Sequence, residues 1–139
     1  GGGLVSTMAD YARFCQMLIN GGEFNGTRIL SEKSIKLMST NVLTEGQKVN
    51  IAGNLTESGS DRLGFGLNFG IILGAEFSKS NYGDGNYFWG GAAGTWFWVD
   101  PANDLFFIGM IQRFPKSPPS VNPDFRGVSQ KFVYDSLAN

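Results

Sequence analysis

The sequence contains no histidine and only one cysteine among its 139 residues. Without histidine, the chain cannot by itself complete a Ser-His-Asp or Cys-His catalytic arrangement, or a zinc site built on imidazole ligands. A single cysteine cannot form an internal disulfide or a thiolate metal site. We therefore expect neither a metal ion nor a bound cofactor.

Charge and long apolar runs are also scarce. Charged residues make up 17% of the chain, and 11 Lys and Arg against 12 Asp and Glu leave a net charge of −1. No basic surplus favours binding to nucleic acid or to an anionic lipid surface. No apolar run approaches the ~20 residues of a transmembrane helix. We expect neither nucleic acid as a partner nor a membrane span.

Glycine and aromatic residues are abundant instead, with 20 glycines and 14% aromatic residues. Many aromatic residues together with many glycines favour a sheet with tight turns over a helical bundle. The N-terminal third nevertheless contains helical patterns. Residues 8–19 place apolar side chains on one helical face after a candidate N-cap at Ser6 or Thr7. Cys15 lies on this face, which predicts a buried core residue over a reactive thiol.

Two further signals follow this helix. Asn25-Gly26 is typical of a two-residue hairpin turn, and Ser31 is a candidate N-cap for a short helix that runs to Met38. From Asn41 to Arg62 the chain is polar and predicts a loop, with room for one short strand at Val49–Ala52.

The second half of the chain has strand patterns and a final helix. Residues 65–71 alternate between apolar and other residues, which predicts a strand. The apolar runs 95–99 and 105–111 flank a turn at residues 100–104 and predict a buried antiparallel hairpin. Asn122-Pro123 is typical of a helix start. The inward face of that last helix is predicted to consist of Phe125, Val128, Phe132, Val133 and Leu137.

The order of these elements predicts an α+β fold. We expect an antiparallel sheet of about three to four strands with the C-terminal helix packed on one face. The sequence contains no internal repeat, so a repeat architecture is not expected.

One segment carries a family resemblance. Trp89-Gly90-Gly91-Ala92-Ala93-Gly94-Thr95 is similar to the active-site strand of the serine β-lactamase-related superfamily, which includes class C β-lactamases, penicillin-binding proteins and β-lactamase-type carboxylesterases. Other segments resemble that superfamily in the same order along the chain: residues 2–14, 20–31 and 63–67. The resemblance covers nearly the whole chain, and it implies a part of the β-lactamase/transpeptidase-like fold.

The resemblance also implies roles for four residues. Trp89-Gly90-Gly91 corresponds to the Lys-Thr-Gly or His-Thr-Gly triplet, with the Trp-Gly-Gly form that carboxylesterases often have. These three residues would bind substrate, and the Ala92 amide would act in catalysis as a donor to the oxyanion. Glycines there suit a substrate that lies against the backbone. Alternatively, Gly90-Gly91 is a bulge or a bend and Trp89 is a core aromatic residue.

The family's nucleophilic motif, Ser-x-x-Lys, does not occur in this sequence. Ser39-Thr40-Asn41 and Ser120-Val121-Asn122 match the letters of the second motif, but their place favours a helix end and an N-cap. The resemblance therefore implies a C-terminal fragment over residues 1–139. Residues 1–62 would be a segment of the helical subdomain with a loop, and residues 63–139 the sheet strands and last helix. The nucleophile would lie in a missing N-terminal segment.

The function implied is that of a serine hydrolase that forms an acyl-enzyme with a small ester, amide or β-lactam. The triplet lacks the cation that would hold a β-lactam carboxylate, which favours an esterase or a peptidase. Arg113 and Lys116, near the presumed site, either attract an anionic substrate or solvate a loop. Two alternatives remain open: an inactive binding or regulatory protein of the same fold, and an interaction module without enzymatic ancestry.

Partners and location follow from the same resemblance. The intact protein would bind a small-molecule substrate, and the missing N-terminal segment would pair with the strand at residues 105–111. Without it this strand is a sheet edge, which predicts a homo-oligomer or aggregate. The resemblance slightly favours a periplasmic or extracytoplasmic location.

Overall fold

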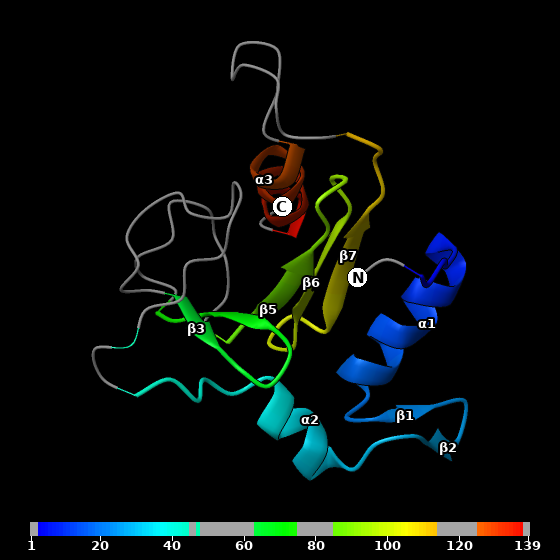
Figure 1. The fold of residues 1–139 in the computed structure, drawn as a ribbon, viewed down its shortest axis with the longest axis vertical. Helices are drawn as coiled ribbons and strands as arrows, with labels where there is room; N and C mark the ends of the chain where they lie inside the picture. Colours follow the sequence, from blue (N-terminus) through cyan, green and yellow to red (C-terminus); the bar gives the residue numbers. More distant parts are fainter. Residues whose placement is uncertain (1–2, 45–46, 48–62, 75–84, 114–124, 138–139) are drawn as a thin grey trace.

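The computed structural model describes residues 3–44, 47, 63–74, 85–113 and 125–137, drawn in colour in Figure 1. Within these ranges the chain has an α+β architecture with three helices, a small hairpin and a five-stranded antiparallel sheet. The elements follow in the order α1 (Met8–Ile19), β1 (Glu23–Phe24), β2 (Thr27–Arg28), α2 (Glu32–Met38), β3 (Leu63–Phe65), β4 (Gly70–Ile72), β5 (Tyr87–Gly90), β6 (Trp96–Asp100), β7 (Leu105–Gly109) and α3 (Phe125–Leu137).

The N-terminal elements form where the sequence predicts them. Thr7 is the N-cap of α1, and its hydroxyl accepts a hydrogen bond from the Asp10 amide at 3.1 Å. In the hairpin between β1 and β2, Asn25 and Gly26 both have positive φ, at 50° and 75°, as a type I′ turn requires. Ser31 caps α2 by accepting from the Ser34 amide at 3.0 Å.

The main sheet has the strand order β3-β4-β5-β6-β7, and every neighbouring pair is antiparallel. It therefore has five strands in the described residues, more than the three to four predicted. The predicted hairpin of β6 and β7 is confirmed, and residues 96–100 pair with residues 105–109. β7 pairs with β6 alone within the described part of the chain, so it is an edge strand there.

The prediction of one strand over residues 65–71 is wrong. The chain instead turns between Gly66 and Phe69, where the Gly66 amide donates to the Phe69 carbonyl at 2.9 Å, and the two halves become β3 and β4. Gly66 also lies so close to α2 that a Cβ atom there would be 1.9 Å from the Met38 carbonyl oxygen. Alternation along the sequence does not reveal this tertiary contact, which only glycine permits.

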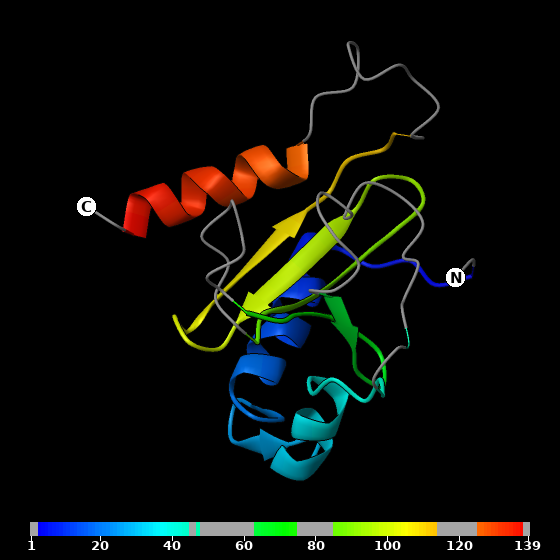
Figure 2. The same cartoon turned by 90° about the vertical axis from the view of Figure 1, so that its left-hand side faces the viewer.

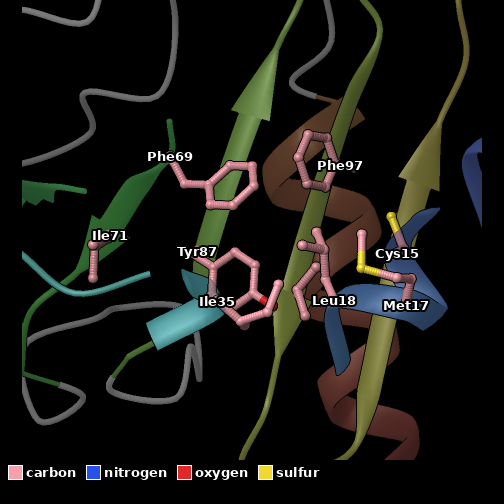
Figure 3. Close-up of a cluster of buried hydrophobic side chains, with 9 residues drawn as sticks. Cys15, Met17, Leu18, Ile35, Phe69, Ile71, Tyr87 and Phe97 are labelled. Carbon is pink, nitrogen blue, oxygen red and sulfur yellow. The ribbon is translucent and has the colours of Figure 1, made fainter. Parts of the chain in front are cut away.

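The sheet is covered on both faces (Figure 1 and Figure 2), so successive residues of its strands enter different cores. Phe97 and Val99 point to the face covered by α1 and α2, whereas Trp96 and Trp98 point to the face covered by α3. Figure 3 shows the first of these cores, in which helix side chains meet those of β4, β5 and β6. Its buried members are Cys15, Met17, Leu18, Ile35, Phe69, Ile71, Tyr87, Phe97 and Val99.

The helix α3 packs on the sheet as predicted, but through a different face. Its buried residues are Gln130 and Tyr134, with Val133 packed beside them. The other four residues of the predicted inward face are exposed: Phe125, Val128, Phe132 and Leu137. The buried face of α3 is held by one aromatic and one polar contact. Tyr134 stacks on Trp98 with ring centroids 5.6 Å apart and hydrogen-bonds to the buried Asp100. Apolar periodicity alone therefore predicted the wrong face of α3 as the buried one.

Some predictions fall on residues that the structure does not describe. They include the short strand at Val49–Ala52, the helix start at Asn122-Pro123, and the place of Lys116. Among the described residues, no helix is long and apolar enough to cross a membrane. The same residues hold no group of three or more acidic, cysteine or histidine side chains that is suited to a metal ion.

Candidate active-site wall

The predicted site residues lie where β5 leaves the sheet. On one side, β4 pairs with the first two residues of β5, Tyr87 and Phe88. On the other side, β6 pairs with β5 along its whole length, up to Gly90 opposite Trp96. In the described part of the chain, the segment from Trp89 onward is therefore bounded by a strand on one side only. On the β4 side, no described strand pairs with the backbone of Trp89 and Gly90.

A tight turn continues from this open end. The Gly94 amide donates to the Gly91 carbonyl at 3.0 Å, and the Gly91 amide donates to the Thr95 carbonyl at 2.7 Å. Neither central residue, Ala92 or Ala93, has a positive φ, so the turn has the character of type I. Ala92 is exposed, and its amide makes no hydrogen bond to any residue that the structure describes. It is an available donor beside the open end of β5.

Trp89 stands beside this turn as an accessible aromatic side chain. It is 38% exposed and belongs to neither buried cluster, so it is not a core residue. Phe65 of β3 meets it edge to face, with ring centroids 5.5 Å apart. The two rings form a partly exposed aromatic pair at the end of β5.

The structure also supplies packing reasons for both glycines. A Cβ atom at Gly91 would lie 2.5 Å from the Thr95 Oγ1 atom of the turn. A Cβ atom at Gly90 would lie 2.9 Å from Nη2 and 3.2 Å from Cζ of Arg126. Close approach of other atoms of this chain is therefore one cause of the glycine pair, in addition to any approach of substrate.

Arg126 is a residue that sequence reasoning missed. It lies in the first turn of α3, donates from Nη2 to the Thr95 carbonyl at 3.4 Å, and places Cζ 5.9 Å from the centroid of the Trp96 ring. Nothing in the sequence pattern joins residue 126 to residue 90, because the contact depends on how α3 crosses the sheet. Arg113 was noted from the sequence, and its amide donates to the Ala93 carbonyl of the turn at 2.6 Å.

A second polar cluster lies at the opposite end of the same strands. The Tyr134 hydroxyl donates to Asp100 Oδ2 at 2.5 Å and accepts from Asn86 Nδ2 at 2.7 Å. Burial raises the pKa of Asp100, but hydrogen bonds from Tyr134 and Asn103 outweigh it and hold that pKa below its ordinary value. This buried cluster ties α3 to the sheet, and its side chains are engaged with one another.

The remaining sequence candidates have structural roles. Asn41 Oδ1 accepts from the amides of Leu43 at 3.1 Å and of Phe65 at 3.0 Å, so Asn41 joins the end of α2 to β3. This confirms the structural interpretation of Ser39-Thr40-Asn41. Cys15 is fully buried, and burial raises the pKa of its thiol to about 12, which confirms it as a core residue. Ser120-Val121-Asn122 lies outside the described residues.

Comparison with known proteins shows which family the chain matches. A family model described as Beta-lactamase matches residues 1–129. Two similar curated proteins come from two strains of Mycobacterium tuberculosis and are named Uncharacterized protein MT1414 and Protein Rv1367c. Each is 40% identical over 119 residues, which cover 83% of this chain and 29% of the relative. The chain thus matches less than a third of the length of either relative.

Proposed function

The chain belongs to the beta-lactamase family, and from this premise we propose that it forms one wall of the active site of a serine hydrolase. The enzyme would form an acyl-enzyme with a small ester, amide or β-lactam. Trp89, Gly90 and Gly91 would line the site, and the Ala92 amide would donate a hydrogen bond to the substrate carbonyl oxygen.

The observation that carries this proposal is the amide of the exposed residue Ala92, which makes no hydrogen bond to a described residue at the open end of β5. When a nucleophile attacks a carbonyl group, negative charge develops on the oxygen, and a preorganised N–H stabilises it. The hydrogen bond from Gly94 to Gly91 holds the turn, so the amide is oriented before substrate arrives. The chemistry fits acyl transfer, the reaction that the family resemblance implies.

The nucleophile would come from another part of the protein. This sequence has no Ser-x-x-Lys motif, and the curated relatives are more than three times as long as the region they share with it. We propose that the serine, its lysine and a tyrosine from the second motif all lie outside residues 1–139. A serine is activated by an adjacent base, so none of the serines here takes that role in the proposal.

The first test uses the full-length parent protein. It is incubated with a fluorophosphonate probe, which labels activated serines, and with p-nitrophenyl butyrate, nitrocefin and a D-alanyl peptide. The proposal expects labelling and turnover of at least one substrate, and no hydrolysis by the 139-residue chain alone. Absence of both labelling and turnover in the parent contradicts it and favours an inactive binding or regulatory protein of the same fold.

The second test removes the backbone N–H hydrogen of residue 92. Ala92→Pro deletes the amide proton at position i+1 of the turn, where proline is favoured, while Ala92→Gly keeps the proton and serves as the matched control. Loss of one oxyanion donor is expected to lower kcat of the parent enzyme by about 10²–10³-fold. The glycine variant retains most of the activity. Equal kcat values for the two variants would exclude the Ala92 amide as the donor.

A further inference from the structure

Three buried hydrogen-bond donors lie between α3 and the sheet. They are the indole nitrogens of Trp96 and Trp98 on β6 and the side-chain amide nitrogen of Gln130 on α3, and none of them has a hydrogen-bond partner among the described residues. The three residues are 7%, 4% and 1% exposed, in that order. Indole and amide nitrogens donate and do not accept, so an acceptor is needed at this interface.

The three donors belong to one contact between a helix and a strand. Trp96 and Trp98 are two residues apart on β6, and both point to the face of the sheet that α3 covers. Arg126 lies over the Trp96 ring, and Tyr134 stacks on the Trp98 ring. Gln130 is four residues from each of these two helix residues, so it lies on the same face of α3, between the two contacts.

Leaving these donors unpaired would be costly. A buried donor without an acceptor typically lowers the folding equilibrium constant by roughly 5- to 150-fold. Three such donors in one interface would remove a large part of the stability of a typical domain. Native structures pair the great majority of their buried polar groups with protein atoms or with ordered water. We therefore expect this interface to hold an acceptor in addition to the described side chains.

The surroundings favour an acceptor without charge. Trp96 and Trp98 belong to an apolar cluster together with Phe88 and Tyr134. The Tyr134 hydroxyl donates to the buried carboxylate of Asp100, so one negative charge already lies at the end of this interface. A second anion nearby would be repelled strongly in the low-dielectric interior. Water is neutral, and a buried water molecule typically makes about three hydrogen bonds to polar groups.

We propose that α3 and β6 enclose a buried water site, in which ordered water molecules accept hydrogen bonds from the Gln130 amide and from the indole nitrogens of Trp96 and Trp98. The amide presents two hydrogens and each indole presents one, so two water oxygens, which accept two hydrogen bonds each, are sufficient. The site makes a glutamine on the buried face of α3 compatible with a stable contact. It does not depend on the hydrolase function proposed above.

The first test is a high-resolution crystal structure of the full-length parent protein, determined with and without a bromide soak. Water oxygens within about 3.2 Å of the Gln130 amide nitrogen and of at least one indole nitrogen support the proposal. An anomalous bromide signal at that position identifies an anion site, and a protein acceptor from outside residues 1–139 identifies a contact with the rest of the parent. Either result, or three nitrogens that face aromatic rings with no oxygen in reach, overturns the proposal.

The second test compares the melting temperatures of Gln130→Met and wild type in the same parent. Methionine has a similar length but no polar hydrogen, so the variant loses its hydrogen bonds to water and should melt roughly 1–4 °C lower. The control is Gln16→Met on α1, where the amide donates to Asn20 at 3.0 Å in an exposed position, and its melting temperature should stay within about 1 °C.

The two explanations of Gln130 predict opposite signs. If its amide is an unpaired donor, methionine removes a desolvation cost, so an unchanged or higher melting temperature of Gln130→Met overturns the water site. The crystal structure uses the wild-type protein, so its result stands whether or not the variant folds.

Discussion

Replacing Tyr134 with phenylalanine tests the buried cluster that holds α3 to the sheet. The hydroxyl group of Tyr134 donates to Asp100 at 2.5 Å and accepts from Asn86 at 2.7 Å. Asp100 is 0% exposed and Asn86 is 1% exposed, so water does not replace the missing group without rearrangement. The phenyl ring keeps the stacking on Trp98. The change therefore removes both of these hydrogen bonds and keeps the ring contact.

The expected loss follows from these two contacts. A hydrogen bond to a charged group contributes about 1.5–3 kcal/mol, and a buried donor that loses its acceptor costs about 1–3 kcal/mol. The two contacts share one oxygen and are not additive, so we expect the free energy of unfolding to fall by about 3 kcal/mol at pH 7. That is a large part of the stability of a typical domain.

The loss is expected to depend on pH. Because the pKa of Asp100 lies below its ordinary value in the folded protein, Asp100 contributes stability above the unfolded pKa of about 4. That contribution disappears as the pH falls through the folded pKa. Tyr134→Phe removes one donor that lowers the pKa of Asp100. The difference in free energy of unfolding between wild type and variant should therefore be smaller at pH 3 than at pH 7.

Urea denaturation at micromolar concentration, followed by tryptophan fluorescence, measures this difference because Trp98 stacks on Tyr134. Tyr87→Phe is the matched control: Tyr87 is 1% exposed, and its hydroxyl makes no hydrogen bond to a described residue. We expect the control to cost less than about 1 kcal/mol. Equal losses for the two variants, or a gap that does not change between pH 7 and pH 3, would refute the reasoning.

Three further outcomes are expected. We propose that the outer edge of β7 pairs with a second copy of the chain, so light scattering should detect dimers or larger species; a monodisperse monomer at high concentration contradicts this. Gly66→Ala places a Cβ atom 1.9 Å from a backbone carbonyl, whereas Gly90→Ala meets only the flexible end of Arg126, so thermal melting should show a far larger loss for Gly66→Ala. The Cys15 thiol, with its pKa raised to about 12, should react with a thiol reagent at pH 8 only after unfolding; rapid reaction of the native chain would argue against its burial.

The sequence correctly predicted the helices, hairpins and turns that are stabilised by interactions between residues close together in the chain. Thr7 caps α1 through a contact three residues away, and Asn25-Gly26 supplies the two positive φ angles of the hairpin turn. The apolar runs of β6 and β7 are joined by a turn in which Asp100 accepts from the Ala102 and Asn103 amides. Each of these interactions lies within a few residues of sequence, so a pattern of residue types reveals it.

Predictions failed where distant residues decide the outcome. The chain predicted as one strand over residues 65–71 turns after Gly66, and Gly66 packs so closely on the carbonyl of Met38 in α2 that no side chain fits there. Apolar spacing predicted one face of α3 as buried. In the structure another face is buried, because Tyr134 on that face hydrogen-bonds to the buried carboxylate of Asp100 on β6. Residues such as Phe125 and Phe132 consequently stay exposed. Periodicity records hydrophobicity, but it does not record which polar group a helix must satisfy.

The candidate site likewise has some features that follow from local sequence and others that depend on contacts between distant residues. The sequence alone determined its chemistry: the Trp89-Gly90-Gly91-Ala92 segment, the family resemblance, and the absence of histidine and of a nucleophilic motif are all properties of residue order. Two features of the site depend on the folded structure: Ala92 lies in a type I turn beside a half-paired strand, and Arg126 lies against Gly90. The physical reason is that residues 90 and 126 meet through the packing of α3 on the sheet, which no local pattern encodes.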